Sequence, residues 1–235
     1  MNSMRKPLYL LYFLLALLFT QAPAQSILPL NIQRSVNKGF RTLTGVPGEN
    51  YFQNRSEYVI QARFDPKHGD LSGNAEITYF NNSLDTLRKI VVRVYQNIAR
   101  KGGIRDEEWD ADNIHKGMTI RKLVINKVSV TDNLAYRTRL EGTNLVVYLS
   151  TPLSPADSVF IEIAWDVKMP GTPVHRFGKY GEGTYFVSLW YPQIAVYDDI
   201  DGWDEMVYTG THEFYNDFNK YDVRIRVPNG FMVWA

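Results

Sequence analysis

The chain has 235 residues, a formal net charge of +1 at pH 7 and no cysteine. This nearly neutral charge argues against nucleic-acid binding, which requires a basic surface. Without cysteine the chain forms no disulfide and carries no lipoprotein lipid anchor, so a packed core must supply its stability. Aromatic residues make up 14% of the chain, which favours a β-rich structure.

Residues 1–24 have the pattern of a signal peptide. Arg5 and Lys6 precede an apolar stretch from Leu8 to Phe19, and Ala22-Pro23-Ala24 supplies the small residues of a cleavage site. The apolar stretch is short for a membrane-spanning helix, although an uncleaved anchor is an alternative. We therefore expect a protein exported to the periplasm, cell surface or medium, with no stable membrane insertion after cleavage.

Residues 25–55 predict an extended lead-in, because glycines and a proline interrupt any periodic pattern there. From residue 56 the chain alternates apolar and polar residues with a period of two, as β-strands do. A hairpin turn is expected at 67–70 and another at Glu141-Gly142. The strands are expected at residues 58–66, 71–83, 86–99, 120–130, 134–142, 143–155, 158–170 and 221–228.

No segment shows a helical pattern, so the sequence predicts an all-β fold, either a sandwich or a saddle-shaped sheet, over residues 56–235. The apolar residues 231–235 read as the opening of another strand. Since chain termini are usually polar and frayed, this ending predicts a product truncated at its C-terminus.

Two segments are rich in acidic residues. The loop at residues 100–117 does not have the ligand spacing of an EF-hand calcium site, so a solvated surface loop is favoured. Residues 197–205 crowd several carboxylates around Gly202 and Trp203, which could serve as a metal or acid/base site. They could equally form Asx turns beside a buried tryptophan. The structural interpretation is favoured, because no histidine accompanies them.

The sequence THEFYND, residues 211–217, begins like the zinc-peptidase motif H-E-x-x-H. Asn216 stands where the motif requires its second histidine, and the following residues alternate as a strand instead of continuing a helix. The remaining histidines, His68, His115 and His175, are isolated. The chain also has no cysteine and no Gly-x-Ser-x-Gly elbow. We therefore expect no catalytic residue, no metal ligand and no cofactor in this chain.

Residues 188–228 resemble the closing part of the N-terminal domain of aminopeptidase N-like zinc metallopeptidases (gluzincins). The likeness is to the exported, Bacteroidetes-type forms, and residues 58–97 resemble the opening strands of the same domain. The matching residues are Trp190-Tyr191-Pro192, Tyr197-Asp198-Asp199, Gly202-Trp203, Glu213-Phe214-Tyr215 and Tyr221-Asp222-Val223.

The resemblance implies a saddle-shaped, non-catalytic domain that forms one wall of a peptide-binding cleft. The zinc, its H-E-x-x-H motif and a downstream glutamate would lie in a catalytic domain of the full-length parent, which would remove N-terminal residues from peptides. The catalytic domain and the peptide substrate would be the partners, and this chain alone is expected to be inactive. Residues expected to line the cleft or the domain interface are Trp190, Tyr191, Pro192, Tyr197, Asp198, Asp199, Trp203 and Glu213.

The resemblance leaves one family feature unassigned. Relatives commonly have a glutamine directly before the Trp-aromatic-Pro sequence, where it holds the α-amino group of the substrate. This chain has Leu189 at that position.

Two alternatives remain open. The chain could be a free-standing secreted β-sandwich that binds peptides or glycans on a platform of Trp190, Tyr191 and Trp203, or a purely structural surface domain. A docking domain should expose a large apolar patch in isolation and aggregate, whereas a binding module should be soluble and monomeric and show saturable ligand binding.

Overall fold

The computed structural model describes residues 28–130 and 136–234, so the expected signal peptide lies outside the described residues. β1 (Arg55–Asp65) and β2 (Asp70–Phe80) form an antiparallel hairpin whose turn spans residues 66–69. Tyr58 and Ile60 of β1 are buried, while Val59 between them is exposed. The alternation in the sequence thus becomes one buried and one solvent-facing side of a sheet, as predicted.

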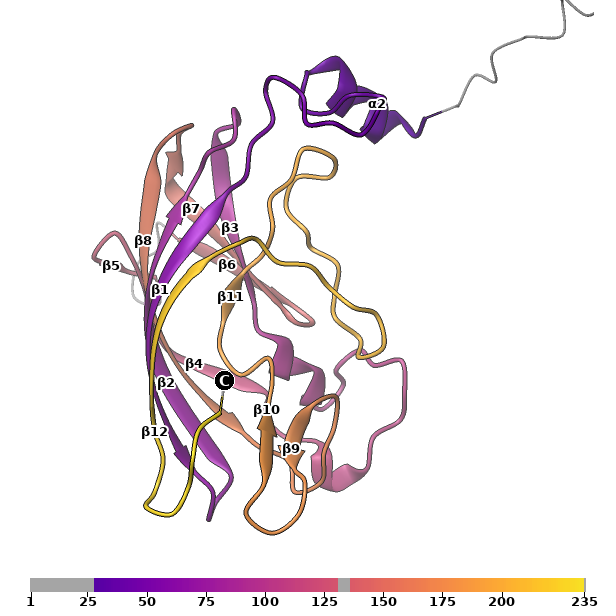
Figure 1. Ribbon diagram of the computed structural model, residues 1–235. Coiled ribbons are helices and arrows are strands. Elements are labelled where there is room, and N and C mark those ends of the chain that lie inside the picture. The colour runs from indigo at the N-terminus through magenta and orange to yellow at the C-terminus, as the bar shows by residue number, and fades with distance from the viewer. Residues whose placement is uncertain (1–27, 131–135, 235) are drawn as a thin grey trace, which may run out of the picture.

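The largest sheet has six strands in the order β12-β1-β2-β8-β4-β5. β12, at one edge, runs parallel to β1, and all other pairs are antiparallel (Figure 1). The added strands are β4 (Met118–Ile125), β5 (Val128–Ser129), β8 (Ser158–Lys168) and β12 (Lys220–Arg226).

A second sheet has four strands in the order β11-β3-β7-β6, and a small hairpin pairs β10 with β9. The turn between β6 and β7 lies at residues 142–143, one residue later than the turn expected at Glu141-Gly142, because Glu141 still pairs with Asn144. These strands are β3 (Leu87–Arg93), β6 (Arg137–Glu141), β7 (Asn144–Leu153), β9 (Phe177–Lys179), β10 (Tyr185–Val187) and β11 (Gln193–Ile194).

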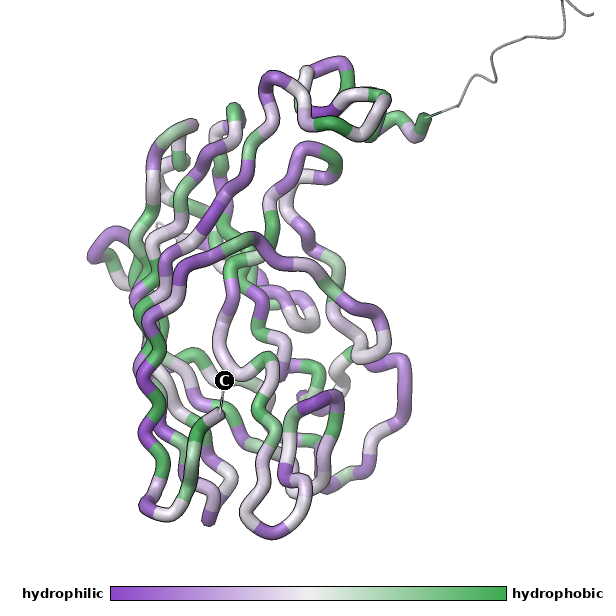
Figure 2. The backbone as a smooth tube through the Cα atoms, viewed as in Figure 1, coloured by the Kyte–Doolittle hydropathy of each residue, from purple (hydrophilic) through white to green (hydrophobic). Residues whose placement is uncertain are grey.

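The main core lies between the two larger sheets. Ile77 and Trp165 from the six-stranded sheet belong to the same buried cluster as Ile90 and Val146 from the four-stranded sheet. Figure 2 shows apolar and polar residues alternating along the strands of the larger sheet. The all-β fold class is confirmed, because sheets supply the main core and the helices are short.

Two expectations about local structure are wrong. Part of the lead-in is a helix, α2 (Leu30–Asn37), and not an extended segment. Its eight residues are too few for a helical period to stand out in the sequence. Residues 231–234 are not a strand; they follow a turn in which the N–H of Phe231 donates to the carbonyl of Pro228 at 3.2 Å.

The segment expected as a strand at 86–99 also ends early. Its last residues form the 3₁₀ helix η1 (Tyr95–Ala99), and the acidic loop contains a second one, η2 (Ala111–Asn113). Within the described residues, no helix is long and apolar enough to cross a membrane.

Candidate functional site

The Trp190-Tyr191-Pro192 sequence packs against the six-stranded sheet. Trp165 of β8 is fully buried, and its indole N–H donates to the carbonyl of Trp190 at 2.9 Å. The two indole rings lie 6.0 Å apart, and Trp190 itself is half-buried. Pro192 is buried directly after them. These residues belong to the tract at residues 188–228, and they cover the core-facing side of the sheet.

Tyr191 reaches toward the first and last strands of that sheet. Its hydroxyl donates to the hydroxyl of Tyr221 on β12 at 3.2 Å, and its ring meets Tyr58 of β1 edge-on at 6.0 Å. Burial, followed by the contact with Tyr221, raises the pKa of Tyr191 above its ordinary value. The residue is a structural contact that keeps its proton at neutral pH.

Trp203 is a core residue. It is 8% exposed, and its ring packs 5.6 Å from Tyr79 and 5.4 Å from Tyr197. The hydroxyl of Tyr197 donates to Asp85 at 2.8 Å, and burial raises the pKa of Tyr197. The alternative of a three-ring platform of Trp190, Tyr191 and Trp203 is therefore wrong, because a platform needs exposed rings and Trp203 is buried.

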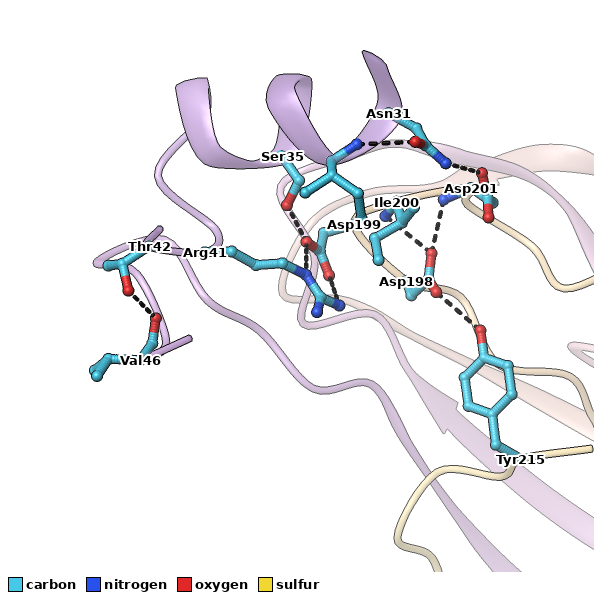
Figure 3. A network of polar contacts seen from close by, with 11 residues as sticks. Asn31, Ser35, Arg41, Thr42, Val46, Asp198, Asp199, Ile200, Asp201 and Tyr215 are labelled. Atoms are coloured by element: carbon cyan, nitrogen blue, oxygen red, sulfur yellow. Dashed lines mark hydrogen bonds and ion pairs between the residues drawn. The ribbon is translucent and has the colours of Figure 1, made fainter. Parts of the chain in front are cut away.

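Asp198 forms the Asx turn that the sequence favours. Its Oδ1 accepts the backbone N–H groups of Ile200 at 2.9 Å and Asp201 at 2.8 Å, while Oδ2 accepts the hydroxyl of Tyr215 at 2.8 Å (Figure 3). These bonds use both carboxylate oxygens to shape the turn that precedes the buried Trp203. The structural interpretation of this acidic run is confirmed for Asp198.

Asp199 binds the N-terminal segment. Arg41 donates to it through Nε at 2.7 Å and Nη2 at 2.9 Å, and the hydroxyl of Ser35 in α2 donates to the same carboxylate (Figure 3). Burial acts to raise the pKa of Asp199, but the bonds from Arg41 and Ser35 outweigh it, so the pKa lies below its usual value. Nearby, the amide of Asn31 donates to Asp201 at 3.0 Å.

Asp199 and its neighbours thus hold the helix that sequence reasoning missed. We call the contacts of Ser35 and Arg41 with Asp199 the N-terminal clasp. Its members lie 164 and 158 positions apart in the sequence, so no local pattern connects them.

His212 and Glu213 do not form a zinc site. Residues 211–217 contain no helix, and the two side chains have separate partners. His212 faces Asp106 at 3.4 Å, and Glu213 accepts from Arg176 at 3.1 Å. The described residues contain no group of three or more His, Cys, Asp or Glu side chains placed to hold a metal. A zinc ion therefore does not fit this motif.

Asp106 ties the acidic loop to the same segment. It accepts hydrogen bonds from the hydroxyls of Thr209, at 2.6 Å, and Thr211. These bonds lower the pKa of Asp106 to about 2. The loop at 100–117, expected to be a solvated surface loop, is thus attached to the residues just before His212.

Leu189 occupies an unusual backbone position. Its φ is +53°, a left-handed conformation that side chains other than glycine rarely adopt. Its carbonyl accepts a bond from the amide of the buried Gln96 at 3.3 Å, and its side chain packs on a small cluster of Tyr95, Ile98 and Tyr208. Leu189 therefore presents an apolar group to an aromatic cluster and has no acceptor for a substrate amine.

Asp217 is a partly buried acid that sequence reasoning did not single out. Burial, followed by repulsion from Asp198, raises its pKa to about 7. It lies just before β12, and Asn219 two residues later accepts the backbone N–H of Ser56 in β1 at 2.6 Å. No sequence signal marks Asp217, because its environment is made by residues distant in the chain.

Several large apolar side chains near the tract are exposed. A hollow of about 260 Å³ has Tyr185, Trp190 and Val227 in its wall, together with the residues that follow β12. The most exposed large apolar residues of this C-terminal region are Met206, Phe218, Met232 and Trp234.

Comparisons with known proteins give similarity in structure alone. No protein family matches the sequence, and no curated protein is significantly similar. An M1 zinc metallopeptidase from Deinococcus radiodurans is similar with a TM-score of 0.41 and 15% identity, covering 78% of this chain and 34% of that one. A mutant two-domain M1 zinc metallopeptidase bound to L-arginine gives a TM-score of 0.37 and 14% identity, covering 78% and 35%.

A third solved structure, a mutant two-domain M1 zinc metallopeptidase bound to L-tryptophan, gives a TM-score of 0.33 and 15% identity over 55% of this chain and 24% of that one. The chain thus spans about a quarter to a third of the length of these solved chains. The activity, substrates and partners of a longer protein are accordingly proposals.

Proposed function

We propose that this chain is the N-terminal, non-catalytic β domain of an exported aminopeptidase N-like zinc metallopeptidase of the Bacteroidetes type. The full-length parent would remove N-terminal residues from peptides, and its zinc would lie in a catalytic domain that these 235 residues do not include. The domain boundaries proposed are a signal peptide at 1–24, a lead-in at 25–55 and the domain at 56–235.

The tract at residues 188–228 carries this proposal. Its characteristic residues are spaced as in the family resemblance, and three of them have defined structural contacts: Trp190 with Trp165, Asp199 with Arg41, and Trp203 with Tyr79. Structural contacts at these positions support the interpretation of the tract as the closing element of such a domain.

The chain would contribute a cleft wall and a docking surface to the parent. Exposed apolar residues in the tract and after β12, such as Met206 and Trp234, are the kind of side chain that a covering domain would bury. Leu189 offers no acceptor, so the group that holds the α-amino end of the peptide would come from another part of the parent. The binding-module alternative loses its proposed platform with the burial of Trp203.

Reading the coding DNA beyond codon 235 is the first test. We expect an in-frame continuation that encodes H-E-x-x-H and a later glutamate. A stop codon at this position in an expressed gene would contradict the proposal.

An activity assay gives a second test. The purified chain with added zinc should not cleave aminoacyl fluorogenic substrates, and Glu213→Gln should behave as the unaltered chain does. Turnover that a chelator abolishes and that Glu213→Gln also abolishes would overturn the assignment of a non-catalytic domain.

A further inference from the structure

The open edge of the six-stranded sheet has an unusual distribution of charge. On the solvent-facing side, Arg63 of β1 lies directly opposite Arg226 of β12, and Gln61 lies opposite Arg224. Like charges directly opposite each other on neighbouring strands are destabilising. Within the described residues, neither Arg63 nor Arg226 has a carboxylate at ion-pair distance, and Arg224 has only a long contact of 3.7 Å with Asp222.

These arginines surround a hollow of about 640 Å³ on the outer side of the sheet. Arg121 reaches its wall from β4, and its charge is paired with Asp166 at 2.7 Å. The rest of the lining mixes the polar residues Gln61, Ser72 and Asn74 with Ala62, Gly73 and Ile225. The hollow therefore offers three guanidinium groups, those of Arg63, Arg224 and Arg226, with little compensating negative charge.

The other side of β12 is apolar and incompletely covered. Tyr221 and Val223 are 43% and 41% exposed, whereas the core-facing Tyr58 and Ile60 of the neighbouring β1 are 2% and 0% exposed. Further along, Ile225 and Val227 line the hollow of about 260 Å³ beside Trp190. The apolar side of the sheet thus extends to β12, but the apolar side chains of β12 remain partly exposed.

β12 is also an edge strand. It pairs with β1 on one side and, within the described residues, with no strand on the other. Figure 1 shows it running along the margin of the sheet beside β1. An edge strand presents unpaired backbone N–H and C=O groups to any extended segment that lies alongside.

We propose that β12 binds an extended, acidic peptide segment that adds a strand to this edge. Side chains of a strand alternate between the two sides of a sheet, so alternate peptide residues would face the arginines and the apolar side of β12. Acidic side chains would offset the charge of Arg224 and Arg226, and the apolar ones would cover Tyr221 and Val223. Backbone hydrogen bonds would provide the remaining affinity.

The probe is a fluorescein-labelled heptapeptide of alternating glutamate and valine, measured by fluorescence anisotropy with the whole chain. A block peptide, in which the glutamates precede the valines, has the same composition without the alternation. We expect the alternating peptide to bind at least about ten times more tightly than the block peptide. Equal binding of the two would overturn the proposal, because charge alone would then explain it.

Two N-methylated peptides test the backbone pairing. Methylation of every second amide removes the donors that face β12 in one version and the donors that face away in the other. We expect one version to lose binding and the other to keep it. Retention of binding by both versions would contradict strand addition.

Variants of the protein locate the site. Arg226→Glu should lower the affinity for the alternating peptide by about tenfold or more. Arg137→Glu is the matched control, because Arg137 is also an exposed arginine on an edge strand, β6; it should change binding less than about twofold. Circular dichroism verifies that both variants are folded, and equal effects of the two substitutions would overturn the assignment to β12.

Sedimentation tests the competing occupant, a second copy of the chain. We expect a monomer that stays monomeric when peptide binds. A dimer that the peptide fails to dissociate and that Arg226→Glu disrupts would assign the edge to self-association and overturn the proposal. A monomer that binds the peptide would also fit the binding-module alternative, so the coding DNA beyond codon 235 tests the proposed function separately.

Discussion

Arg41 and Asp199 form a two-bond ion pair between residues 158 positions apart, with N–O distances of 2.7 and 2.9 Å. The carboxylate of this pair is 7% exposed, and Ser35 donates to it as well. The pair attaches the segment that contains α2 to the acidic turn at residues 198–201.

Asp199→Asn should loosen the N-terminal clasp. The amide cannot accept from Arg41 and Ser35 as a carboxylate does, so the free energy of unfolding should fall by about 1–2 kcal/mol. Hydrogen exchange should accelerate in residues 30–41 before it does so in β1. Asp201→Asn is the control, because Asp201 accepts a single exposed bond from Asn31; equal acceleration in both variants would contradict the role given to Asp199.

Trp203→Ala should be among the most damaging substitutions in the tract. Removing a buried indole leaves a cavity between Tyr79 and Tyr197, which costs about 3–5 kcal/mol of unfolding free energy. Trp234→Ala, which removes a side chain that is 92% exposed, should change stability by less than about 0.5 kcal/mol. Urea unfolding measures the stability of both variants. A Trp203→Ala protein as stable as the original chain would contradict the burial of Trp203.

Asp217 should make stability depend on pH between about 4 and 7. The raised pKa of about 7 means that the folded chain holds a proton that the unfolded chain has already lost. The contribution of the protonated group is therefore complete below the unfolded pKa and disappears as pH rises through 7. Asp217→Asn should stabilise the chain at pH 8 by about 1 kcal/mol, a value reduced for its partial exposure, and by little at pH 4.

Unfolding curves of both proteins at pH 4, 6 and 8 check this prediction. The difference in stability between Asp217→Asn and the original chain should grow with pH. A difference that is constant, or that shrinks as pH rises, would show that Asp217 is not the titrating group.

Gly73→Ala should lower the stability of the chain, because Gly73 of β2 lies opposite Trp165 of β8. A Cβ at this position in β2 would overlap the indole ring, so the ring or the strand must move, at a cost of about 1–3 kcal/mol. Gly171→Ala is the matched control, because no atom lies within 4 Å of its added Cβ. Thermal unfolding compares the two, and equal midpoints would indicate that Trp165 has space to shift.

The strands could be predicted because the alternation of apolar and polar residues that marks a strand involves only neighbouring residues. Residues 55–80 alternate regularly, and the turns at 66–69 and 142–143 carry turn-forming residues, so the hairpins follow from neighbouring residues alone. The helix α2 was missed since eight residues hold about two turns, and its position depends on Asp199. Residues 231–234, the described part of the strand expected at 231–235, form no strand, because an apolar run does not by itself provide a partner strand.

The roles within the tract could be predicted only in part. The density of aspartates with Gly202 indicated Asx turns beside a buried tryptophan, and Asp198 and Trp203 behave in that way. The partners of Asp199 and the raised pKa of Asp217 arise from segments brought together by the fold. A sequence read one segment at a time contains no information on those pairings.

The parallel pair of β1 and β12 has a consequence for folding. The N–H of Ser56 at the start of this pair binds the side chain of Asn219, 163 positions later. A contact of such separation requires closure of a very long loop, which is slow to form. One side of β1 therefore stays unpaired until β12 arrives, so β1 is exposed to intermolecular pairing for longer than β2 or β8. A slow folding phase should report the docking of β12.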